Sequence, residues 1–378
     1  MLNLFRRPSV ARFAILFLAA TSSAAYATAP DDDAWPVSLE EASFEFTGQG
    51  HRFEAFRGRD ALFIEAGAAW IEGSDFENGT IEFDLAIGEA RGFSGVHFRA
   101  VSQGNSEHFY IRHHLDGKPD ASQYTPVYNG LSGWQIYTGQ GFAGPIDLSH
   151  NTWMHIKLEV NRDRAAVYVD SNEPSMIIDD LQRDAASGRV GFNAGNARFA
   201  NIVLRSGNPT IPAAPEAEST DDSTPNTIST WRVSNPFAET AIEASTHVDE
   251  IALGITGWSS LDTTHRGIAN LARLAPHRPD NTAVAAVTLN ADAARTIRAQ
   301  FGFSDRVRVF LNGQLLYTGS DVWTSRDYRF LGTIGFHDEV ALALQEGDNE
   351  LWFAVSEQFG GWGITAAIEA APGVTVVE

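Results

Sequence analysis

Short runs in which apolar and polar residues alternate constrain the fold of this chain more than any other sequence feature. In Met154–Val160 every second residue is apolar, which is typical of a strand with one face on a core and the other in solvent. Gly, Asn and Asp residues, which favour turns, separate this run from similar ones. The similar runs are Ala61–Glu65, Gly79–Ala86, Gly95–Ala100, His108–His114, Ala165–Val169 and Gly188–Phe192. Together they predict an antiparallel β-sandwich of the jelly-roll kind.

The composition agrees with a turn-rich and aromatic-rich chain. Its 378 residues include 33 Gly, 15 Pro, 24 Phe and 9 Trp, and this length suits two ordinary domains. Cysteine is absent, which excludes disulfides, cysteine nucleophiles and cysteine-ligated metals. The net charge of −21 disfavours nucleic acids and anionic membrane surfaces as partners, because a negative surface repels phosphate groups. Uncharged ligands escape this repulsion.

The first 27 residues have the order of a secretory signal peptide. Three arginines precede the apolar run Phe13–Ala20, and small residues ending in Ala25-Tyr26-Ala27 follow it. We expect cleavage after Ala27, because cleavage after Ala29 would place Pro30 beside the scissile bond. A retained N-terminal anchor helix is the alternative, but the apolar run is shorter than the roughly 20 residues that span a bilayer. The mature protein is expected to be exported, to the periplasm or the cell exterior, without membrane attachment.

A proline-rich segment divides the rest of the chain. Residues 206–230 contain four prolines, several acidic residues and no aromatic residue before Trp231, which is typical of an extended linker. The expected organisation is a first β-sandwich at 31–205, this linker, and a second antiparallel β-sandwich at 231–370. We expect nothing in the linker to dock on either domain, so the two sandwiches should fold independently.

Five segments of the first domain carry a resemblance to a known family. They are Phe76–Ile87, Phe93–Ala100, Glu107–Tyr137, Trp153–Asp170 and Gly188–Leu204. In this order they resemble concanavalin A-like or laminin G-like jelly rolls, in a lineage close to the 3-keto-disaccharide hydrolase domain. The resemblance implies the fold, and this scaffold hosts lectins, hydrolases and adhesion modules. The segments EHFYIRHH and QYTPVYNG depart from the hydrolase pattern, so no catalytic residue is carried over.

Polar and aromatic residues gather between Val96 and Tyr137. If Val96, Phe98 and Ala100 face the core, alternation directs His97 and Arg99 to the opposite face. If Phe109 and Ile111 face the core, the opposite face of their strand carries His108, Tyr110, Arg112 and His114. A long loop with further polar and aromatic residues follows. Aromatic rings stack on sugar rings, while amides and guanidinium groups bind sugar hydroxyls. The predicted carbohydrate-binding residues are Arg99, Tyr110, Arg112, Gln123, Tyr124, Asn129, Trp134 and Gln135. The alternative is a structural ion pair between Arg112 and Asp120, with the Trp134 ring in the core.

The second domain contains a clear hairpin signal. In Arg306–Tyr317 the pair Asn312-Gly313 suits a type I′ turn between two alternating strands. This hairpin, followed by the strand-like segment Gly347–Glu369, resembles galactose-binding-like sandwiches. Second-domain candidates for stacking on a sugar are Trp323, Arg326 and Trp362. The alternative for Trp362 is packing in the core or on the neighbouring domain. Residues Ala291–Gln300 have a helix-like pattern.

The motifs leave three functions open. Nucleotide-binding loops, the G-x-S-x-G elbow and H-E-x-x-H are absent from the sequence, so no cofactor is predicted. His108 and His114 share a strand face but lie roughly 20 Å apart along it, so no metal site is predicted. The favoured function is binding of a neutral glycan or oligosaccharide on the polar face of the first sandwich. The alternatives are a glycoside hydrolase or lyase of the 3-keto-disaccharide hydrolase type, acting on plain or oxidised sugars, and an adhesion module. A cleft-facing carboxylate pair in the first domain would favour the enzyme.

Overall fold

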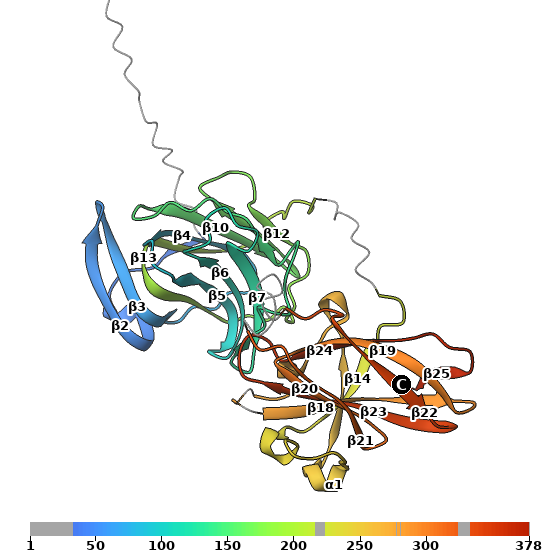
Figure 1. Ribbon diagram of the computed structural model, residues 1–378. Coiled ribbons are helices and arrows are strands. Elements are labelled where there is room, and N and C mark those ends of the chain that lie inside the picture. The colour runs from blue at the N-terminus through green and yellow to red at the C-terminus, as the bar shows by residue number, and fades with distance from the viewer. Residues whose placement is uncertain (1–32, 216–223, 277, 280, 324–332, 378) are drawn as a thin grey trace, which may run out of the picture.

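The computed structural model describes residues 33–215, 224–276, 278–279, 281–323 and 333–377. The expected signal peptide, part of the expected linker and Arg326 lie outside these residues. The described chain is built almost entirely of antiparallel strands arranged as sandwiches (Figure 1), so the predicted all-β class is confirmed. Each of the seven alternating runs in the first domain lies largely within a strand.

The first sandwich is formed by β1 to β13. Its strands are β1 (Ala34–Pro36), β2 (Phe44–Phe56), β3 (Arg59–Ile71), β4 (Gly79–Ile87), β5 (Phe93–Ser102), β6 (Asn105–Arg112), β7 (Ser122–Tyr128), β8 (Leu131–Ser132), β9 (Ala143–Gly144), β10 (Met154–Asn161), β11 (Arg164–Val169), β12 (Met176–Ile178) and β13 (Arg189–Ser206), with a 3-10 turn η1 (Glu41–Ser43). Along one side, β13 pairs first with β5 and then with β4. One long strand therefore joins the layer β5–β6–β7–β8 to the layer β4–β10–β11–β12.

Alternation sorts the side chains of these strands between core and surface. On β10, Ile156 and Leu158 are buried between the two layers, whereas His155 is exposed. On β6, Phe109 and Ile111 point into the same core. The opposite face of β6 therefore carries His108, Tyr110 and Arg112. This arrangement places the predicted polar residues of β6 on the outside of the first sandwich.

The second sandwich has two sheets around a core that contains Trp231, Phe301, Phe353 and Trp362. One sheet has the order β16-β14-β18-β23-β20-β21 and the other β17-β24-β19-β22. The strands are β14 (Thr230–Ser234), β15 (Phe237–Ala238), β16 (Trp258–Asp262), β17 (Ala269–Asn270), β18 (Asn281–Ala291), β19 (Arg295–Ser304), β20 (Arg306–Leu311), β21 (Gln314–Ser320), β22 (Asp338–Leu344), β23 (Gly347–Glu357), β24 (Gly363–Ile368) and β25 (Val374–Val377). The helical elements are η2 (Glu239–Ala241), α1 (Glu250–Leu253), η3 (His265–Gly267) and η4 (Leu271–Arg273). Among the described residues, no helix is long and apolar enough to cross a membrane.

Two local predictions in the second domain have opposite outcomes. The predicted turn is confirmed, because Asn312 and Gly313 connect β20 to β21 with φ angles of 51° and 78°. The prediction of a helix-like stretch at 291–300 is wrong, because Ala291 is the last residue of β18 and β19 begins at Arg295. Within β19 the buried residues alternate as Ile297, Ala299 and Phe301, and this period of two belongs to a strand.

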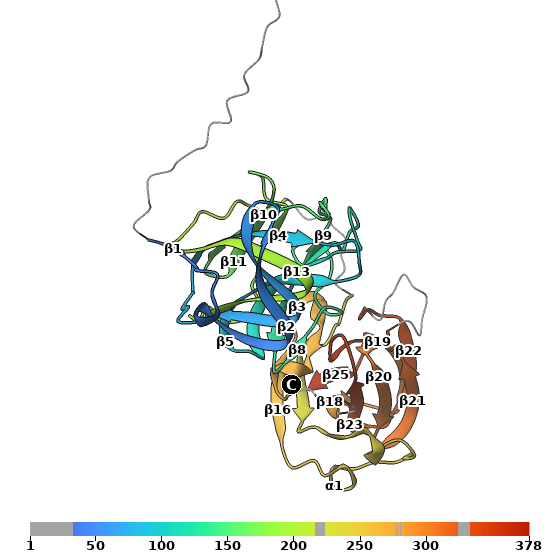
Figure 2. The ribbon, with the colours of Figure 1, turned by 90° about the vertical axis from the view of Figure 1, so that its left-hand side faces the viewer.

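The two sandwiches lie side by side in both views (Figures 1 and 2). Side chains from both described ends of the segment between them pack on the sandwiches. Ile211 is buried against the first sandwich, and Ile228 joins the core of the second. The expectation that nothing in the linker docks is therefore wrong at both of its described ends. At the contact between the sandwiches, Leu131 of the first packs in the core of the second, while Ile268 and Ile334 of the second pack on the core of the first.

Candidate functional site

Three of the predicted site residues meet on the outer face of β6 and β7. Tyr110 lies opposite Gln123 in the strand register, and its hydroxyl donates to Gln123 Oε1 at 2.6 Å. Arg112 Nη2 donates to the Tyr110 hydroxyl at 3.0 Å and also to Gln123 Oε1. Gln123 Nε2 in turn donates to the carbonyls of Trp134 and Tyr137, at 2.9 and 2.6 Å. All three side chains are buried, so this cluster is a floor that holds the loop carrying Trp134.

Arg112 does contact Asp120, but through the main chain of Asp120 and not through the carboxylate that the expected ion pair would use. Arg112 Nη1 donates to the main-chain carbonyl of Asp120 at 2.6 Å. The guanidinium group therefore supports the turn before β7 in addition to binding Tyr110 and Gln123. Alternation correctly brought Tyr110 and Arg112 to one face, and the pairing of β6 with β7 adds Gln123 to it.

A row of stacked rings continues this face towards β3. The ring centroids of Trp70 and His97 are 5.3 Å apart, those of His97 and His108 are 3.8 Å apart, and those of His108 and Tyr110 are 4.9 Å apart. The His97 and His108 rings are nearly parallel, at 4°. Glycine is needed at Gly191, because a Cβ there would collide with the Trp70 ring. Sequence reasoning missed Trp70, because β3 meets this face only through its pairing with β13.

Both histidines of this row are neutral at pH 7. Burial lowers the pKa of His97 well below its usual value, and the neighbouring imidazole of His108 disfavours a proton there further. Burial lowers the pKa of His108 to about 4, although a 2.8 Å hydrogen bond between its Nε2 and Asn193 Oδ1 opposes the shift. The row therefore adds no charge to the face.

Exposed aromatic rings border the floor, and we call them the aromatic rim. Phe93 is 38% exposed and its ring centroid lies 6.2 Å from that of Tyr110. Trp323 is 40% exposed and Phe359 is 56% exposed. Trp134 is half-buried, and its ring centroid lies 5.9 Å from that of Phe359. The rim thus comprises Phe93 and Trp134 from the first sandwich and Trp323 and Phe359 from the second.

Two of the predicted residues point into the core instead. The prediction is wrong for Arg99, because a bulge shifts the register of β5 after Phe98 and Arg99 adopts a φ of 50°. Its buried guanidinium group donates to the carbonyl of Glu77 at 2.7 Å and to Asn78 Oδ1 at 3.0 Å. The prediction is also wrong for Tyr124, which follows Gln123 directly on β7. It therefore takes the face opposite Gln123 and is buried in the core.

Three other predicted residues are engaged at the domain contact or in the second core. Asn129 Nδ2 donates to the carbonyl of Ala272 in the second sandwich at 2.7 Å. Gln135 is buried, and its Oε1 accepts a 2.9 Å hydrogen bond from the hydroxyl of Ser304. The ligand-stacking prediction is wrong for Trp362, because its ring is fully buried and its Nε1 donates to the carbonyl of Val355 at 2.9 Å. The alternative of core packing is correct for this residue.

Buried carboxyl groups near the site face the interior. Glu107 lies on the core side of β6 and accepts hydrogen bonds from the Tyr124 hydroxyl at 2.8 Å and from the Arg183 N–H at 3.1 Å. Burial raises the pKa of Glu107 to about 7, although these hydrogen bonds oppose the shift. Asp305 and Glu357 of the second sandwich are also fully buried. On β5, β6 and β7, no carboxylate of a described residue lies on the outer face with Tyr110 and Gln123.

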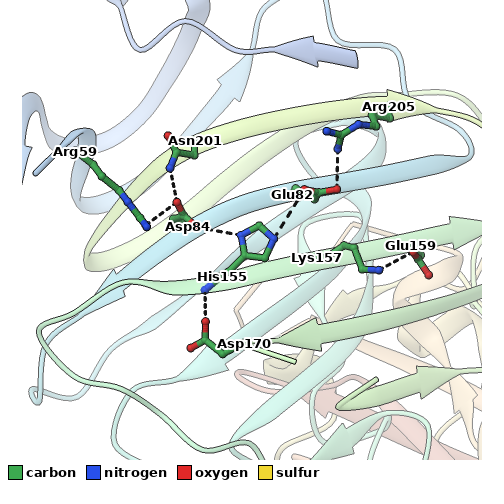
Figure 3. Close-up of polar contacts among 9 residues, drawn as sticks. All are labelled: Arg59, Glu82, Asp84, His155, Lys157, Glu159, Asp170, Asn201 and Arg205. Atoms are coloured by element: carbon green, nitrogen blue, oxygen red, sulfur yellow. Dashed lines mark hydrogen bonds and ion pairs between the residues drawn. The ribbon is translucent and has the colours of Figure 1, made fainter. Parts of the chain in front are cut away.

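A second polar cluster lies on the outer face of β4 and β10, and Figure 3 shows its members. Asp84 accepts hydrogen bonds from Arg59 at 2.6 Å, from Asn201 at 2.5 Å and from His155 at 3.0 Å. Burial alone would raise the pKa of Asp84, but the hydrogen bonds from His155 and Asn201 and the charge of Arg59 lower it overall. The negative charge of Asp84 is balanced by hydrogen-bond donors within the cluster, which is typical of a structural network.

A pocket of about 750 Å³ adjoins this network between β1, the β2–β3 hairpin and β13. Its lining includes Val37, Phe53, Arg59 and Asn201. Because Arg59 and Asn201 are already bound to Asp84, the pocket offers a ligand fewer free polar groups than its lining suggests. In the part of the chain that the structure describes, no three His, Asp or Glu side chains are placed to hold one metal ion.

No protein-family model matches the chain, and no curated protein sequence matches it. Solved structures provide partial matches. A carbohydrate-binding module from Bacillus subtilis is 18% identical over 43% of this chain and 96% of its own, with a TM-score of 0.33. A protein with a galectin-like fold from Bacillus subtilis is 12% identical over 44% and 91%, with a TM-score of 0.34. A Bacillus licheniformis β-glucanase is 10% identical over 46% and 97%, with a TM-score of 0.33. Each of the three matches less than half of this chain.

Proposed function

We propose that this protein binds an uncharged glycan at the first-sandwich part of the aromatic rim, formed by Phe93 and Trp134, beside the polar outer face of that sandwich. The observation that carries the proposal is the exposure of aromatic rings over a buried polar floor that is already hydrogen-bonded. An exposed ring that is held in place can stack on the apolar face of a sugar without losing much side-chain entropy.

Polar groups at the rim can form hydrogen bonds with the hydroxyl groups of a sugar. Arg91 and His114 are exposed beside Phe93, with the His114 ring centroid 5.8 Å from that of Phe93. Partial burial and the charges of Arg91 and Arg112 lower the pKa of His114, so its imidazole is neutral at pH 7. A neutral imidazole both donates and accepts hydrogen bonds, as a sugar hydroxyl does.

Binding is favoured over cleavage of a glycosidic bond. Glycoside hydrolysis usually requires two carboxyl groups that flank the scissile bond. Glu107, Asp305 and Glu357 are fully buried and bonded to other protein groups, so none of them can reach a sugar at the rim. We also propose that binding takes place after export, because of the signal-like first 27 residues; sequencing the N-terminus of the secreted protein tests this.

The test is binding of the whole protein to a panel of neutral oligosaccharides, followed by calorimetry on any hit. Replacing Phe93 with Ala should weaken binding by about tenfold, since one stacked ring contributes on the order of 1 to 2 kcal/mol. Trp35→Ala is the matched control, because Trp35 is 41% exposed but lies on β1 and not at the rim. Unchanged affinity in Phe93→Ala, or release of reducing sugar by the wild-type protein, would contradict the proposal.

A further inference from the structure

We infer that the glycan site crosses the boundary between the two sandwiches, so that its ligand is a linear oligosaccharide and not a single sugar. This inference rests on the proposed function and extends it. It assigns Trp323 and Phe359 of the second sandwich to the same site as Phe93 and Trp134 of the first.

The rim is continuous across the boundary. The Arg91 guanidinium carbon lies 5.8 Å from the ring centroid of Phe93 and 5.5 Å from that of Trp323, so it links the two sandwiches. The Trp323 and Phe359 ring centroids are 6.4 Å apart. The Trp134 and Phe359 ring centroids are 5.9 Å apart, so these rings form a contiguous strip of aromatic contacts. A ligand longer than one sugar can therefore contact rings of both sandwiches.

The contact between the sandwiches holds these rings in fixed positions. The N–H of Gln135, the neighbour of Trp134, donates to the carbonyl of Gly360, the neighbour of Phe359, at 3.1 Å. A Cβ at Gly360 would collide with the Gln135 side chain, so this side chain packs directly on the backbone of Gly360. The rim therefore needs no rearrangement of the sandwiches before a ligand binds.

Buried carboxyl groups anchor the turn that carries Phe359. Asp305 Oδ2 accepts the N–H groups of Gln358 and Phe359 at 2.9 and 3.0 Å. Glu357 Oε1 accepts the N–H of Gly361 at 3.0 Å. These bonds fix the backbone on both sides of Phe359, so its exposed ring is held rather than loose.

The charge of the protein favours an uncharged oligosaccharide over a charged one. The chain carries a net charge of −21, which disfavours polyanions. The floor beneath Phe93 contains neutral histidines, and the Arg112 guanidinium group is already bound within it. Arg91 is an exposed positive group at the rim, but the net negative charge of the chain repels a polyanion, whereas an uncharged oligosaccharide can use the rings and the hydroxyl-binding groups without this repulsion.

The experiment measures the affinity of the full-length mature protein for oligosaccharides of one to six units from the cello-, malto- and xylo-series. Affinity is expected to rise with length over several units. Phe359→Ala and Trp323→Ala are each expected to weaken binding of the longest ligand by about tenfold. Trp35→Ala again serves as the matched control.

The outcomes separate this inference from the proposed function. If the wild-type protein binds no member of the panel, the proposed function fails. If Phe93→Ala weakens binding but Phe359→Ala and Trp323→Ala do not, only the extension across the boundary is overturned. Melting curves check the fold of each variant, and Trp323→Ala decides the question if Phe359→Ala proves unfolded. Self-association that both substitutions abolish would instead identify the rim as a contact between two copies of the chain and overturn the inference.

Discussion

Hydrogen bonding within the protein decides which polar residues of the first sandwich remain available to a ligand. Tyr110, Arg112 and Gln123 have side chains suited to binding sugars, but their groups are directed at one another and at the loop carrying Trp134. Their role in the proposed site is to support the rim. The exposed ring of Phe93, which sequence reasoning did not select, is the better candidate for direct contact with the ligand.

Trp134 shows how a single residue can serve both core and surface. Its ring is half-buried and contacts Phe359, while its carbonyl accepts a hydrogen bond from Gln123. We expect Trp134→Ala to weaken glycan binding by on the order of 1 to 2 kcal/mol and to lower the melting temperature by only a few degrees. Calorimetry and thermal melting of the same sample measure both effects. A fall of many degrees would show that the ring belongs mainly to the core.

His155 makes the stability of the first sandwich depend on pH. The hydrogen bond to Asp84 and the charges of Asp84 and Glu82 raise the pKa of His155, although burial opposes the shift. A histidine whose pKa is raised on folding stabilises the protein below its unfolded pKa, and this contribution disappears as pH rises through the folded pKa.

We therefore expect His155→Gln to lower the free energy of unfolding at pH 5.5 and to have a smaller effect at pH 8.5. The difference should be about 0.5 kcal/mol, because half of the His155 side chain is exposed and solvent screens the pair. Urea denaturation at the two pH values measures it, and added salt should reduce it. An equal effect at both pH values would contradict the assignment.

At the scale of single elements, a bulge and a turn determine the site. The bulge in β5 directs Arg99 inward and leaves His97 on the outer face. The turn between β23 and β24 carries Phe359 and is held by Asp305 and Glu357. Burial and the nearby charge of Asp305 raise the pKa of Glu357 to about 8. The folded protein therefore keeps a proton on Glu357 at pH values where the unfolded chain releases it.

We predict that the free energy of unfolding falls as pH rises from about 4.5 to about 8, because the unfolded state then binds fewer protons than the folded state. Glu357→Gln removes the titration but keeps an oxygen that can accept the N–H of Gly361. We expect the stability of this variant relative to the wild-type protein to increase over that pH range, by up to a few kcal/mol. Urea denaturation at pH 5, 7 and 9 measures it. Glu346→Gln, at an exposed position, is the control, and parallel pH profiles of Glu357→Gln and the wild-type protein would contradict the prediction.

For the whole molecule, the contact between the sandwiches determines whether they unfold together. Leu131, Ile268 and Ile334 pack across the boundary, and Gln135 bonds to Gly360 there. Independent folding, which the proline-rich segment predicts, remains a prediction, but these contacts favour coupled unfolding.

Gly360→Val tests the coupling, because its added atoms would collide with Gln135. We expect calorimetry to give one unfolding transition for the wild-type protein and two for this variant. Gly347→Val is a matched control, since Gly347 also has a positive φ but no atom lies within 4 Å of its added Cβ. Two transitions in the wild-type protein would instead support independent sandwiches, and one transition in both variants would show that Gly360 is not essential to the coupling.

Local sequence patterns are enough to predict the β class, most strands of the first sandwich, the Asn312-Gly313 turn and the common face of Tyr110 and Arg112. These features depend on alternation and turn chemistry, which are local properties of the chain. Contacts between distant segments are what turn Arg99 and Tyr124 inward, bring Trp70 into the row of rings, and place Phe359 of the second sandwich beside Trp134 of the first. A bulge, a strand pairing between distant segments and a packed boundary between sandwiches each bring together residues far apart in sequence, and no local pattern records those contacts.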